Sequence, residues 1–486
     1  MYMGIDVGTS AVKVAIVDEA GEVVDQAAAA LTVSRPRALW SEQNPSDWWT
    51  ATNSAVAKLR PMHRRAVRGI GMSGQMHGAT LLNKQMQPLR PAILWNDGRS
   101  GIECAELETA VPDMAAITGN RAMPGFTAPK LLWVRRHEPD LFSQIHTVLL
   151  PKDYVRLHMT GDTASDMSDS AGTLWVNVAQ RSWSDTMLSA TGLDTAHMPK
   201  LFEGDRITGN LRREQAEAWG MARVPVAAGG GDNAAGAVGV GVVQVGDAFL
   251  SLGTSGVLFV ANDGYRPNPG GGVHTFCHAL PHRWHQMAVI LSAASCIDWA
   301  ARLCGLKGAS ALFDLAAARN QPAATELFLP YLSGERTPLN DPKAQGVLFG
   351  LTHESDASAI AQAVLEGIAF ALRDGMEALL ASGAAIDSLA VIGGGARSAY
   401  WGRILSSILH RPLTYRDAGT VGPAYGAARL ARIAVDGASI EDVCKPPPIL
   451  HVVEPDQRVA ELYDDRFRRY RRLYQHLKEI FWEATP

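Results

Sequence analysis

Short apolar runs alternate with glycine-containing turns along most of this chain. An apolar run reaches Val17, and Val23-Val24 follows an Asp-Glu-Ala-Gly turn, which predicts a β-meander over residues 1–30. Apolar residues at helical spacing predict helices over 40–59, with a cap at Asn44, over 357–382 and over 456–483. Strands that alternate with helices in this way indicate an α/β fold.

One stretch, residues 224–256, concentrates the polar residues that follow strands. The apolar run 224–228 predicts a buried strand, and Gly229-Gly230-Gly231 lets the backbone turn sharply before Asp232 and Asn233. In open α/β sheets, ligands bind at the carboxyl ends of the strands. Asp232 is therefore interpreted as a general base, as a helix N-cap, or as both.

A short motif occurs once in each half of the chain. Gly8-Thr9-Ser10 follows the first apolar run, and Gly253-Thr254-Ser255 follows another; both are expected to bind phosphate through backbone N–H groups and hydroxyls. The repeat predicts two related α/β domains, over 1–242 and 243–486, that face a shared cleft. Asp6 of the first copy is Ser251 in the second, so Asp6 is expected to have a chemical role.

Polar residues at other strand ends predict the rest of a pocket. Gln75-Met76-His77 ends one strand, and Trp95-Asn96 follows another. His77 is either a ligand contact or a core histidine, and its neighbours favour the pocket. Gly394, Gly395 and Ala396 follow the strand 389–392, where they would either let a nucleotide lie flat against the backbone or simply form a tight turn.

Composition excludes several classes of function. The chain has 486 residues, 47% hydrophobic and 19% charged, with a net charge of −4 and no charged tail, so no nucleic-acid partner is expected. Five scattered cysteines, no spanning apolar stretch and no signal segment lead us to expect a cytoplasmic protein. The histidines of 274–285 match no standard zinc spacing. The arginines of 466–472 are expected to form a solvated face.

These residues together resemble the FGGY carbohydrate kinases of the actin/hexokinase-like superfamily. The likeness covers nearly the whole chain and includes two further segments, Gly125-x-Thr127-x-x-Lys130-Leu131-x-Trp133-Val134 and Gly346–Leu351. The second signature departs at Ala359, where a polar residue is usual, and we expect only a surface effect. Within the family, four segments are most similar to the kinases of D-xylulose: Ser73–Gly78, Leu94–Arg99, Leu150–Tyr154 and Ser333–Pro338.

The resemblance implies two actin/hexokinase-like (ribonuclease H-like) domains around a central cleft. It further implies ATP and Mg²⁺ as cofactors and phosphorylation of D-xylulose to D-xylulose 5-phosphate. Met76 and His77 would contact the sugar, Asp232 would be the catalytic base, and Asp6 would lie at the metal, reached through water, with Asp232 as a second candidate ligand.

The expected partners are a small-molecule sugar and ATP, without nucleic acid or membrane, and a homodimer is left open. One alternative is a kinase for another ketopentose or polyol. A non-enzymatic actin-like nucleotide switch and a metal hydrolase built on the histidines are the others.

Overall fold

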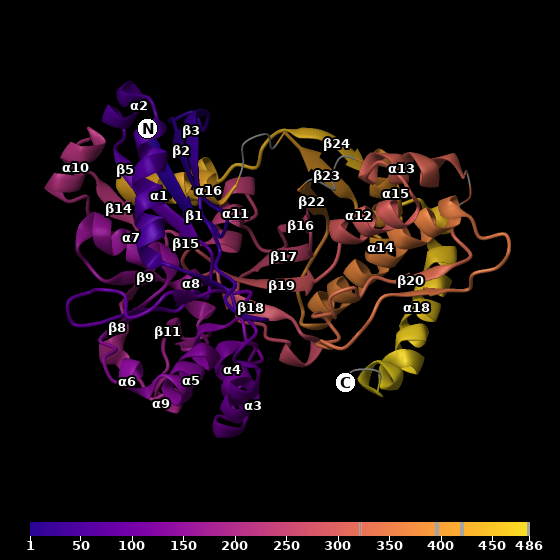
Figure 1. Cartoon of the computed structure of the whole chain (residues 1–486). Helices are drawn as coiled ribbons and strands as arrows, with labels where there is room; N and C mark the ends of the chain where they lie inside the picture. Colours follow the sequence, from indigo (N-terminus) through magenta and orange to yellow (C-terminus); the bar gives the residue numbers. More distant parts are fainter. Residues whose placement is uncertain (320, 322, 394–397, 418–421, 484–486) are drawn as a thin grey trace.

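The computed structural model describes residues 1–319, 321, 323–393, 398–417 and 422–483. Two mixed sheets, one in each half of the chain, form the centres of two α/β halves (Figure 1). We call residues 1–242 the N-terminal half and residues 243–486 the C-terminal half. The predicted division at 242/243 itself remains a prediction. No helix in the described part of the chain is long and apolar enough to span a membrane.

The sheet of the N-terminal half has seven strands. Their order is β13-β14-β5-β1-β2-β3, with β15 also paired to β5. The first three strands are the predicted meander. The bounds are β1 (Tyr2–Val7), β2 (Ala11–Val17), β3 (Val23–Ala30), β5 (Gly69–Gly74), β13 (Ile207–Asn210), β14 (Pro225–Ala227) and β15 (Gly230–Gly231).

Alternation along β1 directs its side chains to two different helical layers. Met3 and Ile5 pack in one core cluster with residues of α1 (Pro45–Lys58) and α7 (Pro151–Thr160). The side chain of Asn44 caps α1 as predicted, by accepting from the N–H of Ser46.

The opposite face of this sheet is covered by α16 (Pro423–Asp436), a helix from near the end of the chain (Figure 1). Its backbone lies directly on the strands. A Cβ at Gly4 would come within 1.7 Å of the carbonyl oxygen of Ala424, and one at Gly71 within 1.9 Å of that of Ala427. Only glycine permits this approach. The N-terminal half is therefore completed by residues of the C-terminal half.

The sheet of the C-terminal half repeats the first arrangement. β16 pairs antiparallel with β17 and parallel with β22, as β1 does with β2 and β5. The predicted repeat is thus a repeat of topology. The order is β18-β19-β17-β16-β22-β23-β24, with bounds β16 (Ala248–Leu252), β17 (Gly256–Asn262), β18 (His274–Cys277), β19 (Trp284–Ile290), β22 (Leu389–Ile392), β23 (Leu413–Arg416) and β24 (Ile449–Val453).

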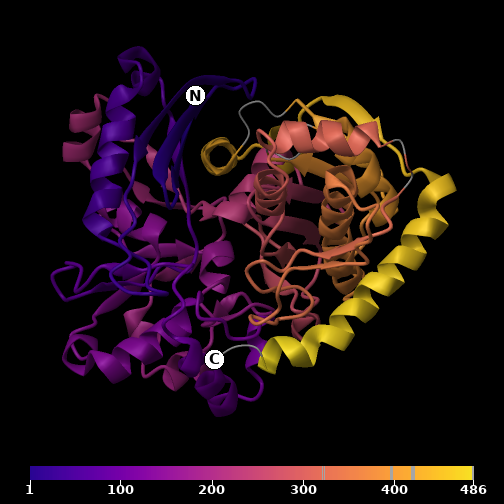
Figure 2. The same ribbon diagram turned by 45° about the vertical axis from the view of Figure 1, so that its right-hand side comes forward.

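The helices of the C-terminal half correct two predictions. Figure 2 shows α18 (Gln457–Glu483) along its outer side. Arg466 is not on a solvated face: it is buried, and its Nε donates to Glu366 of α14 (Ala357–Ala381) at 2.9 Å. Ala359, in the first turn of α14, is also fully buried, so its substitution in the signature affects the core and not the surface. Both side chains are buried where the local sequence predicted exposure. The other helices are α12 (Ala294–Leu303), α13 (Ala309–Ala318) and α15 (Ala399–Leu409).

Shorter elements connect these layers and build the cleft walls. In the N-terminal half they are β4 (Glu42–Gln43), α2 (Pro61–Arg65), β6 (Thr80–Leu82), β7 (Ala92–Ile93), α3 (Gly101–Ala110), α4 (Met114–Thr118), α5 (Thr127–His137), α6 (Pro139–Phe142), β8 (Thr147–Leu149), β9 (Ala164–Asp166), α8 (Met167–Ala171), β10 (Val176–Asn177), β11 (Ser182–Trp183), α9 (Asp185–Ala190), η1 (Thr195–His197), β12 (Lys200–Phe202), α10 (Arg213–Trp219) and α11 (Asp232–Val240). In the C-terminal half they are η2 (Pro269–Gly271), β20 (Leu327–Leu329), β21 (Val347–Phe349) and α17 (Ile440–Val443).

Candidate active site

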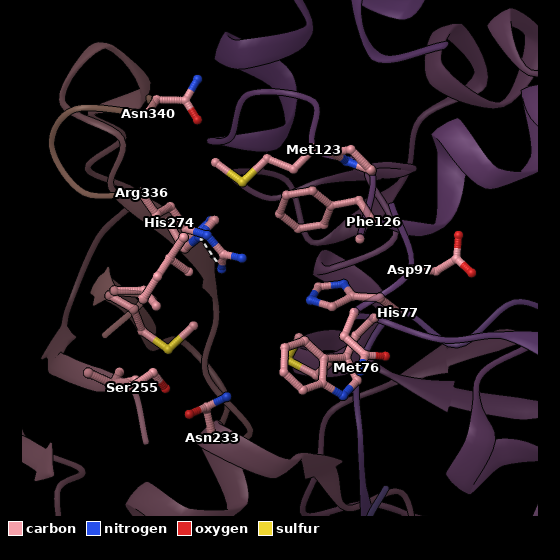
Figure 3. Close-up of a pocket in the computed structure, with 18 of the residues that line it drawn as sticks. Met76, His77, Asp97, Met123, Phe126, Asn233, Ser255, His274, Arg336 and Asn340 are labelled. Carbon is pink, nitrogen blue, oxygen red and sulfur yellow. Dashed lines mark hydrogen bonds between the residues drawn. The ribbon is translucent and has the colours of Figure 1, made fainter. Parts of the chain in front are cut away.

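A cavity of about 640 Å³ lies between the two halves, with walls from both (Figure 3). Its volume falls in the range of small-molecule sites. Seven of the residues singled out from the sequence line it: Met76, His77, Trp95, Asn96, Asp232, Asn233 and Ser255. The structure therefore brings the predicted strand ends of the N-terminal half and one residue of the second small-residue turn together at one cavity.

Asp232 is the first residue of α11 and follows directly on the glycine run. Its Oδ1 accepts from the backbone N–H of Asn233 at 2.7 Å and from that side chain's Nδ2 at 3.0 Å. Burial raises the pKa of Asp232 to about 6, although these two hydrogen bonds oppose the rise. A carboxylate with this pKa is largely ionised at neutral pH and can still accept a proton.

A buried polar network holds the turn in front of Asp232. The N–H of Gly231 donates to Ser168 Oγ at 3.0 Å, and that hydroxyl donates to Asp166 Oδ2 at 2.5 Å. Asp166 in turn pairs with Lys152 at 2.8 Å, and both side chains are fully buried. The Leu150–Tyr154 segment, singled out in the sequence, thus acts behind the cavity wall and not on its surface.

Asp6 lies near the end of β1, opposite Ser73 of β5. It is 7% exposed, and its Oδ1 has no hydrogen-bond partner among the described residues. Burial, and next the charge of Asp232, raise the pKa of Asp6 to about 7. Two carboxylates that repel each other and leave an oxygen free suit a hard cation, which would offset both charges.

A metal held only by protein side chains is not indicated. No group of three or more His, Cys, Asp or Glu side chains in the described residues is arranged to hold an ion. Two of the histidines in 274–285 instead stack on phenylalanines: the rings of His285 and Phe259 are 4.5 Å apart, and those of His274 and Phe276 are 5.8 Å apart. Asp6 and Asp232 fit Mg²⁺ only in the usual way, in which one or two carboxylates share the ion with water and phosphate oxygens.

His77 projects into the cavity from a left-handed backbone conformation, with φ at +69°. Its Nδ1 lies 2.6 Å from the carbonyl oxygen of Gly172, and a carbonyl can only accept. Nδ1 therefore carries the hydrogen, and Nε2 is left as an acceptor. Burial lowers the pKa of His77 to about 3, so the ring is neutral. The ring of Phe126 packs against it edge-on at 4.7 Å.

The first family signature explains how this strained position is held. Lys130 Nζ and Thr127 Oγ1, both from α5, donate to the carbonyl oxygen of His77 at 2.9 and 3.1 Å. Lys130 is fully buried, and burial lowers its pKa well below the usual value. Gly125 is required because a Cβ there would come within 2.2 Å of the carbonyl oxygen of Trp95. The segment thus fixes two walls of the cavity.

The first small-residue turn, Gly8-Thr9-Ser10, is tied to the cavity wall by Thr9. Trp95 Nε1 donates to Thr9 Oγ1 at 3.0 Å, and Thr9 Oγ1 donates to Gln75 Oε1 at 2.9 Å. Gln75 is buried behind the wall and is not among the residues that line the cavity. Gly8 closes its turn by donating to Ala11 at 3.1 Å.

The second turn is braced from the opposite side. The carbonyl oxygen of Thr254 accepts from the N–H of Ala293 and from Ser295 Oγ, each at 2.9 Å, and that of Gly253 accepts from the N–H of Ala294 at 3.0 Å. The predicted nucleotide residues Gly394, Gly395 and Ala396 lie outside the described residues.

The wall from the C-terminal half was largely missed. Glu335 is buried and accepts from the N–H groups of Leu291 and Arg336 at 2.9 and 2.7 Å. Burial raises its pKa to about 8. His274, Arg336 and Asn340 lie on the same wall. The polar Ser333–Pro338 loop was the available signal, but nothing in its spacing says which cavity it faces.

Two mixed-sheet α/β halves of repeated topology meet at one cavity that both of them line. The models for the N- and C-terminal domains of the FGGY family of carbohydrate kinases match residues 1–239 and 248–435. The chain belongs to the FGGY family of carbohydrate kinases.

Individual relatives agree with this assignment. The chain is similar to a xylulose kinase from Escherichia coli K12, with 56% identity over 98% of this chain and 99% of the relative. It is 53% identical to a xylulose kinase from Klebsiella pneumoniae, over 99% of this chain and 100% of that one. The crystal structure of a xylulose kinase from Rhodospirillum rubrum superposes with a TM-score of 0.92 at 28% identity, over 99% of both chains.

Proposed function

We propose that this protein transfers the γ-phosphoryl group of ATP to the 5-hydroxyl of D-xylulose, giving D-xylulose 5-phosphate and ADP. The main observation behind this proposal is that Asp232, an ionisable carboxylate, and His77 line the same cavity, which both halves share. The 56% identity with a xylulose kinase over 98% of the chain supports the choice of sugar.

Asp232 is proposed as the general base. Its carboxylate would accept the proton of the attacking hydroxyl as the bond to phosphorus forms, a contribution typically worth about 10²–10⁴-fold in rate. The Ser168 network fixes the turn before it, and Asn233 holds Oδ1. The second carboxylate oxygen is left for the substrate.

Met76, His77, Trp95, Asn96 and Asn233 are proposed to bind the sugar. His77 Nε2, an acceptor in the neutral ring, would take a hydrogen bond from a sugar hydroxyl. The Trp95 and Met76 side chains provide apolar surface against the carbon chain. Gln75 would act indirectly, by holding Thr9 and with it the indole of Trp95.

The two small-residue turns, Gly8–Ser10 and Gly253–Ser255, are proposed to hold the phosphates of ATP from opposite sides of the cleft. Gly394, Gly395 and Ala396 are proposed to lie beside the adenosine. Mg²⁺ is proposed at Asp6, reached through water, with Asp232 only as a second candidate ligand. It would neutralise phosphate charge when bound. The orphan oxygen of Asp6 supports this position.

In this scheme residues 1–242 form the sugar-binding domain and 243–486 the nucleotide-binding domain. Closing the cleft would join the two substrates and exclude water. A homodimer is also proposed, which the mass measured by light scattering tests.

A coupled ADP-release assay tests the proposed substrate. D-Xylulose should give the highest kcat/KM in a panel with D-ribulose, L-ribulose, L-fuculose, glycerol and gluconate, and ³¹P NMR should place the phosphate on O5. A higher value for another sugar would reassign the substrate within the family. ATP turnover independent of every sugar would favour a nucleotide switch.

A further inference from the structure

Arg336 brings an uncompensated positive charge to the cavity wall of the C-terminal half. In the described part of the chain its guanidinium makes one hydrogen bond, from Nη1 to Nε2 of His274 at 3.4 Å, and no salt bridge. The neighbouring Glu335 makes no salt bridge with it: Glu335 Oε1 accepts from the backbone N–H groups of Leu291 and Arg336, and burial raises the pKa of that carboxyl to about 8. Arg336 lines the cavity and is only partly buried, so its unused donors are free to bind an acceptor of a ligand there.

A relay from the N-terminal half fixes the direction of Arg336. Asn120 Nδ2 donates to the carbonyl oxygens of Thr118 and Thr275 at 2.8 and 2.9 Å, which leaves its Oδ1 as an acceptor. His274 Nδ1 lies 3.0 Å from that oxygen and therefore carries the hydrogen. His274 Nε2 is then the acceptor for Arg336. The ring stays neutral, because burial lowers its pKa well below the usual value.

Arg336 faces His77 across the cavity (Figure 3). The two are close enough for the charge of Arg336 to lower the pKa of His77. Their hydrogen-bonding capacities are opposite: His77 Nε2 only accepts, whereas a guanidinium only donates. A ligand between them must offer a hydroxyl to one wall and an oxygen with free lone pairs to the other.

The chemistry of the substrate supplies such an oxygen. A 2-ketopentose closes its furanose ring by attack of O5 on C2, so its 5-hydroxyl is free only in the open-chain form. In that form C2 is a carbonyl, whose oxygen accepts hydrogen bonds but cannot donate them. Any enzyme that phosphorylates O5 of such a sugar therefore binds the keto form.

We propose that Arg336 donates hydrogen bonds to the C2 carbonyl oxygen of the open-chain ketopentose, and so determines the preference for ketoses over polyols. His274 is the positioning residue that aims it. This inference rests on the proposed function and extends it, since it assigns the contact made by the C2 end of the sugar in the same site. It also gives the C-terminal half a direct contact with the sugar, in addition to the nucleotide.

The test compares D-xylulose with D-arabinitol, a polyol formed when that carbonyl is reduced. Arg336→Met, Arg336→Lys and the control Arg302→Met, at an exposed position on α12, are assayed as full-length enzymes. Kinetics are measured with both sugars and with ATP. The affinity for D-arabinitol is taken as a competitive inhibition constant against D-xylulose.

We expect Arg336→Met to lower kcat/KM for D-xylulose about ten- to a hundredfold, while the constant for D-arabinitol changes less than about threefold. Arg336→Lys should recover part of the loss, and Arg302→Met should match the wild type. Equal losses on both ligands, or an unchanged D-xylulose value, would overturn the assignment of Arg336 alone. A wild-type enzyme inactive on every ketopentose would overturn the proposed function and this inference with it.

Discussion

The carboxylate of Asp6, near the end of β1, lies close enough to Asp232 of α11 for the charge of Asp232 to raise its pKa. The two come from different strand ends of one sheet; Asp6 is buried, whereas Asp232 is partly exposed on the cavity wall. Their mutual repulsion makes the simultaneous ionisation of both carboxylates unfavourable. A cation bound at Asp6 is therefore expected to lower the pKa of Asp6 and to keep its carboxylate ionised.

Replacing Asp232 by Asn should nearly abolish sugar phosphorylation while the protein remains folded. Asn keeps the shape of the side chain at the first residue of α11, whose N-cap is Gly231 and not residue 232 as the sequence had suggested, but Asn cannot take a proton. We expect kcat to fall by about 10²–10⁴-fold. ATP binding, measured by calorimetry, should survive because the phosphate turns lie elsewhere. Asp298→Asn, at an exposed position on α12, is the matched control. Near-normal turnover in a folded Asp232→Asn enzyme would remove Asp232 from the role of base.

The pH profile should report the raised pKa of Asp232. The base works only when ionised, so kcat/KM for the sugar should fall as pH drops through about 6, whereas an unshifted aspartate would sustain activity to about pH 4. The assay uses saturating Mg²⁺, which is expected to keep Asp6 ionised, so that the acid limb reports the ionisation of Asp232. His77, with its pKa near 3, adds no limb in this range. An acid limb at pH 4 or below would contradict the assignment.

A substitution at Asn233 provides a second test of the acid limb of the kcat/KM profile. Its side-chain hydrogen bond lowers the pKa of Asp232, so Asn233→Ala should move the acid limb of kcat/KM upwards in pH. The position of the limb is informative even if the variant also binds sugar less tightly. An unmoved or lowered limb would show that this hydrogen bond does not set the ionisation of the base.

Asp6→Ala should raise the Mg²⁺ concentration needed for half-maximal activity and lower kcat. Ser251→Ala, at the matching position of the other repeat, should change neither by more than about twofold, since a hydroxyl adds no charge to a metal site. A Mg²⁺ titration at saturating ATP and sugar measures both. Equal losses of activity in the two variants would contradict the proposal that Mg²⁺ binds at Asp6 and not at the matching position of the second repeat.

His77→Ala should raise the apparent KM for D-xylulose about ten- to a hundredfold and leave the KM for ATP unchanged, because the sugar loses a buried partner. The left-handed backbone complicates this variant, since Ala adopts it poorly. His77→Asn tolerates that conformation but cannot reach as far, and it should reproduce the kinetic defect with a smaller loss of melting temperature. A fall in melting temperature with an unaltered sugar KM would make His77 a structural residue only.

Sequence reasoning located the part of the site that local pattern encodes. A carboxylate after a glycine run and polar residues at strand ends are local signals; they singled out Asp232, His77 and Trp95, which line the cavity and whose roles stay predictions. The repeat likewise gave the paired hairpins. These features depend on neighbours in sequence, because a strand end and its turn fix where the next side chains point.

What escaped prediction depends on contacts between distant segments. The side chain of Arg336, on the cavity wall, hydrogen-bonds to His274. His274 in turn hydrogen-bonds to Asn120 of the other half. Arg466 was expected in water because its neighbours on α18 are charged, yet Glu366 of α14 neutralises it in the core. A helical pattern shows which residues share a face, but not what will cover that face.

The cover that α16 provides has a consequence for how the protein is made. A ribosome releases the chain from its N-terminus, so β1 and β5 emerge long before the helix whose backbone rests on Gly4 and Gly71. Until residue 436 leaves the exit tunnel, one face of the first sheet lacks its permanent partner. The two halves therefore cannot mature one after the other. The sheet formed by the first residues of the chain is completed only when synthesis is nearly over. A truncated product would therefore expose an apolar sheet face that chaperones and proteases recognise.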